Sequence, residues 1–391
     1  KFWDKWTEIA LVKRILVGLI LGAILGIAVP QATGIAILGD VFVSALKAIA
    51  PLLVFFLVIS SLCNAGKSHG GVIKTVIILY MFSTVLAAVI AVFASMAFPV
   101  KMTLANAATD TSAPQGIVEV LNNLLLNVVA NPVSSLVNAN YVGILMWAVL
   151  LGLAFRAADK MTKKVLADVA DGISMVVTWI INLAPFGIFG LVFNTVSTNG
   201  LDIFTTYGKL LLLLVGCMLF IYFVTNPLLV YWCIRQNPYP LIFQCLKRSA
   251  LTAFFTRSSA ANIPVNMKVC EEMGLDRDTY SVTIPLGATI NMDGAAITIT
   301  VMTMATAFTL GIHVDIPTAI ILSLLAALSA CGASGVAGGS LLLIPMACSL
   351  FGISDDISMQ VVAVGFIIGV VQDSVETALN SSSDLLLSAS A

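Results

Sequence analysis

The residues Asn291-Met292-Asp293-Gly294 interrupt an apolar stretch that runs from about residue 282 to residue 309. A charged side chain at the centre of a membrane span costs roughly 2.5 to more than 10 kcal/mol, so such residues are rare outside functional sites. An acid at that depth marks, by default, the pathway of an ion or a substrate. The stretch therefore predicts a membrane protein with a functional carboxylate in its interior.

The composition extends this interpretation to the whole chain of 391 residues. Hydrophobic residues make up 59% of it and charged residues only 10%, whereas a soluble domain has about 25% charged residues. The formal net charge is −1, which argues against a nucleic-acid-binding surface. The seven cysteines form no C-x-x-C pair, and His69 and His313 are too widely separated for a zinc site. We therefore expect an all-α polytopic membrane protein.

Six apolar runs are long enough to cross a bilayer. They lie near residues 9–30, 39–66, 72–98, 139–157, 164–198 and 205–234. The more polar segment 99–138 predicts an external loop with short helices. Lysine and arginine gather before the first run, after the second, between the fourth and fifth and after the sixth, whereas the opposite side has mainly Lys101 and Lys209. The positive-inside rule therefore places the N-terminus in the cytoplasm.

After residue 235 the apolar runs are interrupted. The run near 239–272 is broken by Thr256-Arg257-Ser258-Ser259, and the run near 316–352 is broken by a glycine-rich segment around Gly335. Each half is too short to cross the bilayer alone. We therefore predict two re-entrant helical hairpins with non-helical tips, because non-helical backbone at that depth is tolerated where it lines a cavity.

Each predicted tip is followed by a span that polar residues interrupt, at Asp293 after the first tip and at Asp373 after the second. Paired interrupted segments in corresponding halves of a chain are the best sequence indication of a transporter binding site. Asp373, Glu376 and Asn380 are spaced by three and four residues, so they share one helix face. Asp384 continues that face one turn further.

These residues suit a zwitterionic amino acid and a cation. Asp373 offers an acceptor for an ammonium group, and the backbone N–H groups near Ser258 and Ser259 attract a carboxylate. A sodium ion takes oxygen ligands, which carbonyls at broken helices supply together with polar side chains. The oxygen-bearing side chains in suitable places are those of Asn291, Asp293, Asn380 and Asp384. A helix cap at the membrane interface is an open alternative for Asp384, as is a hydrogen bond in a kinked helix for Asn291.

The combined motifs resemble the dicarboxylate/amino acid:cation symporters, the glutamate transporter family. The matching segments are Thr256-Arg257-Ser258-Ser259, Asn291-Met292-Asp293-Gly294, Gly332-Ala333-Ser334-Gly335-Val336 and the helix from Asp373 to Asp384. The resemblance is strongest over residues 240–390. It implies a glutamate-transporter-like elevator fold, with eight transmembrane helices, two opposed hairpins, inverted repeats and a homotrimer. It also implies that a transport domain (72–98 and 205–391) moves against a scaffold (1–71 and 99–204).

The resemblance further implies roles for single residues. Ser259 and the tip backbone hold the substrate carboxylate, Val336 covers it, and Asp373 binds the amino group beside Thr377 and Asn380. One sodium ion is bound by Gly287, Asn291, Asn380 and Asp384. A second is bound by the carbonyls of Thr289, Met292, Ala330 and Ala333. A third is bound by Tyr80, Ser83, Thr84, Asn291 and Asp293.

Three departures from the family pattern bear on the substrate. Members with acidic substrates have an arginine where this chain has Glu376, an aspartate where it has Gly369, and a threonine where it has Ala295. A carboxylate that faces a substrate carboxylate repels it. The resemblance therefore implies sodium-coupled import of small, neutral, hydroxylated amino acids such as serine and threonine across a bacterial inner membrane. Glu376 either accepts a hydrogen bond from a hydroxyl or pairs with Arg257.

Other classes of protein fit the sequence less well. Ser334 lies in a G-x-S-G motif, but a serine nucleophile needs a base within reach, and both histidines fall outside the predicted core. An aspartyl dyad of Asp293 and Asp373 leaves the paired hairpins unexplained, and single acids do not make the selectivity ring of a channel. Within the family, an acidic-substrate or proton-coupled symporter is the alternative.

Overall fold

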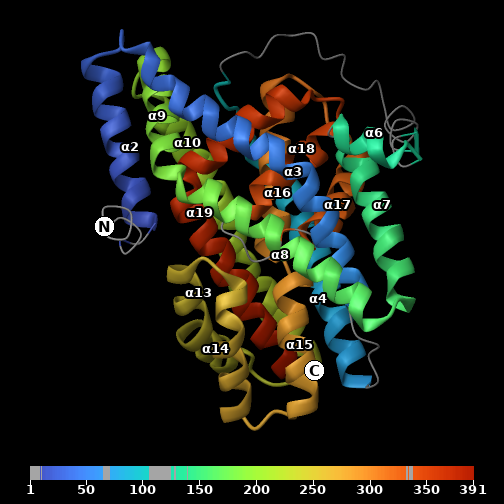
Figure 1. The fold of residues 1–391 in the computed structure, drawn as a ribbon. Helices are drawn as coiled ribbons and strands as arrows, with labels where there is room; N and C mark the ends of the chain where they lie inside the picture. The colour runs from blue at the N-terminus through green and yellow to red at the C-terminus, as the bar shows by residue number, and fades with distance from the viewer. Residues whose placement is uncertain are drawn as a thin grey trace.

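In the part of the chain that the computed structural model describes, the regular secondary structure is all helical (Figure 1). That part comprises residues 9, 11–64, 71–104, 125–126, 129–138, 140–331, 333 and 338–391. Five helical segments within it are long and apolar enough to cross a membrane. They are Gly71–Ala97, Lys160–Asn182, Ile203–Ile234, Val282–Thr309 and Asp355–Ser390. The prediction of an all-α protein with several membrane-spanning helices is confirmed.

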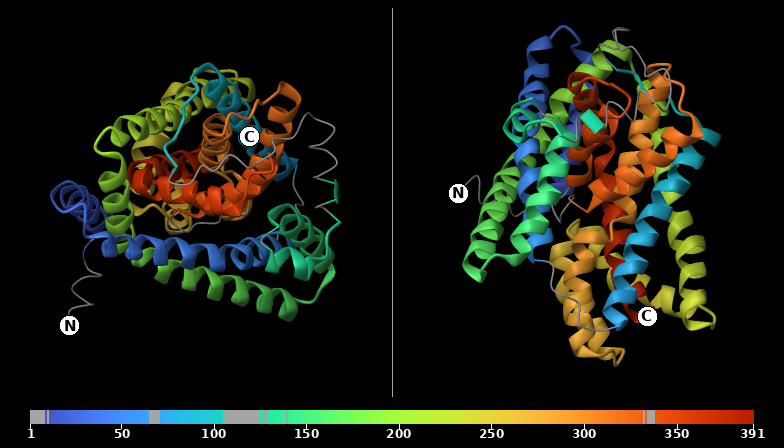
Figure 2. Two further views of the ribbon diagram at one scale, coloured as in Figure 1. Left: turned by 90° about the horizontal axis from the view of Figure 1, so that it is seen from above. Right: turned by 90° about the vertical axis from the view of Figure 1, so that its right-hand side faces the viewer.

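One group of helices comes from the first half of the chain and packs mainly against itself. It consists of α2 (Leu11–Ala28), α3 (Ile37–Asn64), α6 (Pro132–Val137), α7 (Tyr141–Ala154), α8 (Lys160–Asn182) and α9 (Ala184–Asn199). Helix α2 lies along α9, and α3 contacts α7, α8 and α9. Figure 2 (left) shows α3 and α8 side by side along one edge of the molecule.

The contact between α2 and α9 depends on glycine. Gly18, Gly22 and Gly26 lie one turn apart on α2, and each faces a backbone carbonyl oxygen of α9. A Cβ atom at Gly22 would lie 2.6 Å from the carbonyl oxygen of Phe189. Between membrane helices, small residues allow this close approach, and van der Waals packing replaces the hydrophobic effect as the attractive force.

A second group surrounds two central helices, α16 (Asp293–Thr309) and α19 (Asp355–Ser390), which are buried over most of their length. Around them lie α4 (Gly71–Ala97), α10 (Ile203–Phe220), α11 (Asn226–Ile234), α12 (Tyr239–Cys245), α13 (Leu251–Thr256), α14 (Ser259–Glu272), α15 (Arg277–Ile290), α17 (Ile316–Ala330) and α18 (Ile344–Ser349). Single π-helical turns join α10 to α11 and α12 to α13. A 3-10 turn, Gly339–Leu343, precedes α18.

Two helix breaks occur at the predicted motifs. Between α13 and α14, Arg257 takes the left-handed backbone conformation with φ 52°, and Ser258 caps α14. Between α15 and α16, Asn291 and Met292 are non-helical. The glycine-rich segment after α17 lies largely outside the described residues, since Gly332 and 334–337 are not among them.

One sequence-based boundary was wrong. The predicted span 164–198 is two helices, α8 and α9, because Pro185 enters the first turn of α9 and cannot continue the hydrogen bonding of α8. The polar residues around Asp373 interrupt the apolar run but not the helix, and Asp373, Glu376 and Asn380 lie on the single helix α19, as their spacing predicts. Asp373 meets its partners through its side chain, so the backbone there keeps its helical hydrogen bonds.

We expect Gly22→Leu to destabilise the protein by at least about 1–3 kcal/mol, the usual cost of overpacking. The obstructing atom is a backbone oxygen, so α2 and α9 must separate. Thermal unfolding in detergent measures the loss. Gly34→Leu is the matched control, because no atom lies within 4 Å of a Cβ there. Equal unfolding temperatures for the two variants would contradict the close-packing role of Gly22.

Candidate functional site

Side chains from both described breaks meet α19 around one small cavity of about 20 Å³. Its lining residues are Arg257, Ser259, Met292, Ala333, Asp373, Glu376, Thr377 and Asn380. All of the predicted substrate residues except Ser258 and Val336 are in this set. Ser258 is instead the cap of α14, where its hydroxyl accepts from the N–H of Ala261 at 3.2 Å. Val336 lies outside the described residues.

Asp373 is buried and has two donors. Its Oδ2 accepts from Nε of Arg257 at 2.6 Å, and its Oδ1 accepts from the backbone N–H of Gly338 at 3.1 Å. The left-handed turn at Arg257 directs this side chain from the end of α13 toward α19. The alternative in which Arg257 pairs with Glu376 is therefore wrong. Arg257 pairs with Asp373, one turn earlier on the same helix.

Glu376 is held by neutral donors. Its Oε2 accepts from Oγ1 of Thr298 at 2.7 Å, from Oγ of Ser340 at 2.9 Å and from Nε2 of Gln372. All three groups meet a single oxygen of this carboxyl group, which fixes its position between them. The same residue lines the cavity, so a single acid joins α16, α19 and the segment before α18 at this point.

Sequence analysis missed this group of donors. Thr298, Ser340 and Gln372 form no motif with Glu376, because they are distant along the chain except for Gln372. The available signal was the position of a threonine and a glutamine within apolar membrane helices, because polar side chains that are buried there require hydrogen-bond partners. Their exposed surface is 0–1%.

Thr377 and Asn380 mainly satisfy backbone groups. The hydroxyl of Thr377 donates to the carbonyl of Asp373 at 2.8 Å. The side-chain oxygen of Asn380 accepts from the N–H of Gly294 at 2.7 Å, which ties α19 to the first turn of α16. A helix start has unsatisfied N–H groups, so this contact stabilises the break at Met292.

A second polar cluster surrounds Asp293, which is completely buried. Ser83 donates to its Oδ2 at 2.7 Å, and Oγ1 of Thr84 lies 3.2 Å from its Oδ1. Oγ1 of Thr84 is also 2.9 Å from the carbonyl oxygen of Tyr80. The side-chain oxygen of Asn291, next to this cluster in sequence, is buried and has no partner within the described part of the chain.

Asp384 lies nearer the C-terminal end of α19 than Asp373 does, and it is buried like Asp293. Its Oδ1 accepts from Nδ2 of Asn291 at 2.9 Å, and its carbonyl oxygen accepts from the hydroxyl of Tyr80 at 2.9 Å. Gly287 lies against the same carboxylate, since a Cβ there would be 2.8 Å from Oδ1. The interfacial helix cap considered for Asp384 is therefore wrong, as this residue is inside the helix and inside the protein.

The remaining predicted ion ligands lie where α15 and α17 end. Ala330 is the last residue of α17, and its carbonyl oxygen accepts from the N–H of Ala333. Met292 and Ala333 line the cavity, whereas Thr289 bonds within α15 through its hydroxyl. The thiol of Cys331, next to Ala330, is 3.7 Å from the carbonyl oxygen of Ile290. The two helix ends are therefore neighbours.

Comparison with known proteins relates the whole chain to transporters. Residues 11–391 match the sodium:dicarboxylate symporter family. The serine/threonine transporter SstT of Bifidobacterium adolescentis is 59% identical over 389 residues, which cover 99% of this chain and 90% of that protein. The proteins of the same name from Streptococcus thermophilus and Streptococcus agalactiae serotype Ia are 55% and 57% identical over 390 residues, covering all of this chain and 97% of each relative.

We expect Arg257→Ala to destabilise the protein by about 3 kcal/mol, because it leaves the buried carboxylate of Asp373 without its cation. Arg248→Ala is the matched control. It breaks the ion pair with Glu272, whose side chains are 33% and 43% exposed, and exposed pairs contribute at most about 1 kcal/mol. Thermal unfolding in detergent compares them. A smaller loss of stability for Arg257→Ala than for Arg248→Ala would contradict the prediction that the buried ion pair stabilises the protein more than the exposed one.

Proposed function

Because this chain belongs to the sodium:dicarboxylate symporter family, we propose that it imports serine and threonine together with sodium. Membership makes it a multi-pass membrane transporter and not a protease or another enzyme. The names of its relatives support hydroxylated amino acids as substrates. The observation that carries the proposal is the pair of acids, Asp373 and Glu376, that line one cavity, where Arg257 is the one cation among the described lining residues.

The substrate ammonium binds Asp373 in this proposal. In the structure the guanidinium of Arg257 is bound to that carboxylate. An incoming ammonium group therefore takes the place of the guanidinium as its cationic partner. Arg257 is then available to the substrate carboxylate, together with Ser259 and the N–H groups at the start of α14. The exchange leaves each charge paired, which a buried site requires. Val336, Thr377 and Asn380 complete the proposed substrate site.

Glu376 selects the side chain of the substrate. Three donors hold one of its oxygens, and the carboxylate faces a cavity in which a substrate hydroxyl donates to it. An aspartate or glutamate substrate would bring a second carboxylate to the same place. Like charges in a site that excludes water repel strongly, so neutral substrates are favoured.

Sodium ions occupy the sites around Asp293 and Asp384. Neither acid has a basic partner among the described ion pairs, and a buried charge without a counter-ion is costly. Asn291 donates to Asp384 and lies two residues before Asp293 in sequence. Its side-chain oxygen has no hydrogen-bond partner among the described residues and supplies a ligand. The other proposed ligands are Tyr80, Ser83, Thr84, Gly287, Thr289, Met292, Ala330, Ala333 and Asn380.

Sodium entry also couples uptake to the membrane potential. One sodium ion that enters with a neutral zwitterion moves one charge, worth about 2.3 kcal/mol per 100 mV. This corresponds to roughly fifty-fold accumulation from the voltage alone.

The two helix groups correspond in this proposal to a scaffold (1–71 and 99–204) and a transport domain (72–98 and 205–391) that moves as an elevator. The packing of α2, α3, α7, α8 and α9 against one another supports such a division. The proposed topology has eight transmembrane helices and two re-entrant hairpins with inverted repeats, near 239–272 and 316–352. The protein is a homotrimer of a bacterial inner membrane with its N-terminus in the cytoplasm.

Counterflow in liposomes tests the substrate and the ion together. We expect labelled serine to exchange with internal serine or threonine only when sodium is present. Aspartate should not exchange, because Glu376 repels its side chain. Asp373→Asn should abolish exchange while the protein still inserts. Exchange of aspartate, or serine exchange driven by protons after sodium is replaced by choline, would support the alternative substrates or coupling ion.

We expect Glu376→Arg to lower kcat/KM for serine by roughly 10- to 100-fold, since a hydrogen bond to a charged group contributes about 1.5–3 kcal/mol. The new cation should also allow aspartate to compete. Glu376→Gln is the control, because it keeps a hydrogen-bond acceptor but removes the charge. Competition uptake assays measure both effects. Unchanged competition by serine and aspartate in Glu376→Arg would place this side chain outside the substrate site.

A further inference from the structure

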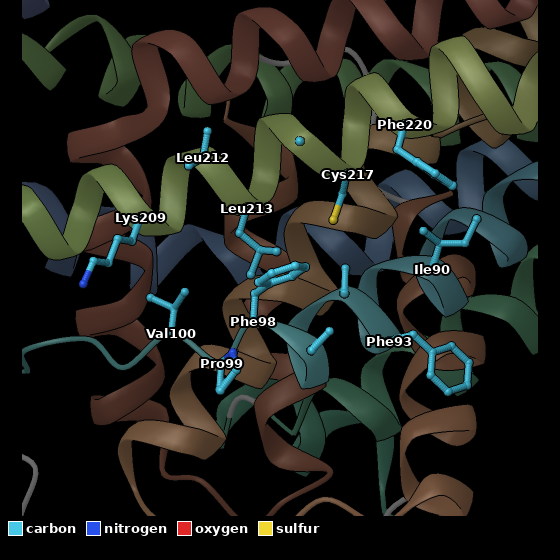
Figure 3. Close-up of a pocket in the computed structure, with 13 residues that line it drawn as sticks. Ile90, Phe93, Phe98, Pro99, Val100, Lys209, Leu212, Leu213, Cys217 and Phe220 are labelled. Atoms are coloured by element: carbon cyan, nitrogen blue, oxygen red, sulfur yellow. The ribbon is translucent and has the colours of Figure 1, made fainter.

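A large cavity lies away from the acids. It is a groove of about 820 Å³ between the end of α4, the segment that follows it, and α10 (Figure 3). Its walls are apolar apart from Lys209, and Phe93, Phe98 and Phe220 are among them. Phe93, on the spanning helix α4, is 53% exposed, and Phe98, just beyond the end of that helix, is 70% exposed. In a membrane protein, an exposed aromatic side chain on a spanning segment faces lipid or another protein.

The groove has the length of one lipid leaflet. It extends along α10 from Lys209 to Phe220, which is about 16 Å at ~1.5 Å per residue. The hydrocarbon core of a bilayer is about 30 Å thick, so the groove spans about half of it. This length suits a single acyl chain that enters from one membrane face.

The polar end of the groove is positively charged. Figure 3 shows Lys209 at one end and Ile90, Phe93 and Phe220 toward the other. Lys101, which follows the lining residue Val100, is also exposed. Within the described part of the chain, neither lysine forms an ion pair. They are the two cations that the charge pattern of the sequence assigns to the external side of the membrane.

The segment that forms one wall is anchored. After α4 ends at Ala97, the backbone N–H of Met102 donates to Oγ1 of Thr309 at the end of α16, at 2.8 Å. Phe98 and Val100 are therefore held between two fixed points, so the groove has a defined shape.

We propose that this groove binds one acyl chain of an anionic phospholipid from the outer leaflet, with its phosphate at Lys209. An apolar channel of leaflet length with a cation at the headgroup level complements both parts of such a lipid. The bound lipid contacts α4, the helix that also carries Ser83 and Thr84 beside Asp293. The proposal rests on the membrane location of the chain and is independent of the substrate proposed above.

Native mass spectrometry of the full chain from bilayers tests the proposal. The bilayers contain phosphatidylethanolamine with either phosphatidylglycerol or phosphatidylcholine. We expect one retained phosphatidylglycerol per chain. Lys209→Gln should lower the preference for phosphatidylglycerol over phosphatidylcholine roughly fivefold, the contribution of one lysine near an anionic surface.

Two glycines of α10 provide a matched pair of variants. Gly216 lines the groove and Gly208 does not, and a Cβ atom meets nothing within 4 Å at either position. Gly216→Leu should remove the retained lipid, whereas Gly208→Leu should keep it. Both variants should unfold at the temperature of the unmodified protein.

Three results would reject the proposal. The first is either equal lipid retention by Gly216→Leu and Gly208→Leu or an unchanged headgroup preference in Lys209→Gln. The second is retention of a free fatty acid in place of a phospholipid. The third is a second copy of the chain that covers the groove, seen as a dimer that Gly216→Leu dissociates. Because Lys209 is exposed, we expect Lys209→Gln to fold, so its headgroup preference still tests the proposal if Gly216→Leu does not fold.

Discussion

The structure depends on how four acids are kept inside a membrane protein. Asp293, Asp373, Glu376 and Asp384 are each at most 5% exposed, and an isolated charge in such surroundings is strongly disfavoured. Each acid therefore requires donors or a cation from another part of the chain. This requirement explains why α16 and α19, which carry the acids, lie at the centre of the second helix group and are covered by the other helices.

The helix breaks follow from the same requirement. In lipid, a broken helix leaves backbone groups unsatisfied, so it is tolerated only where protein or a polar cavity surrounds it. Here the breaks and the acids satisfy each other. Asn380 accepts from the N–H at the start of α16, and Asp373 accepts from the N–H of Gly338. The non-helical segments are therefore parts of the polar interior, and their position next to α19 brings Arg257 and Ser259 to the cavity.

Much of this organisation was predictable from the sequence, because membrane location, helix breaks and intramembrane acids leave strong local signals. The break at Asn291 and the burial of Asp293 are examples. The choice of partner was not predictable: Asp373 and Glu376 lie one helical turn apart and are both far from Arg257 in sequence, and only the packing of α13 against α19 decides between them. The donors of Glu376 were missed for the same reason, since Thr298 and Ser340 meet it only in the folded chain.

The two acids of the cavity differ in what can replace their partners. Asp373 is bound by a guanidinium, and an ammonium group of similar charge can take its place without leaving a buried charge unpaired. Glu376 is bound by two hydroxyls and an amide, and a substrate with one hydroxyl cannot replace all three. On the proposed function, Asp373 therefore exchanges partners during binding while Glu376 keeps its position. A fixed carboxylate that offers its remaining acceptor capacity to a hydroxyl discriminates by chemistry, whereas the exchangeable one recognises the amino group that all candidate substrates share.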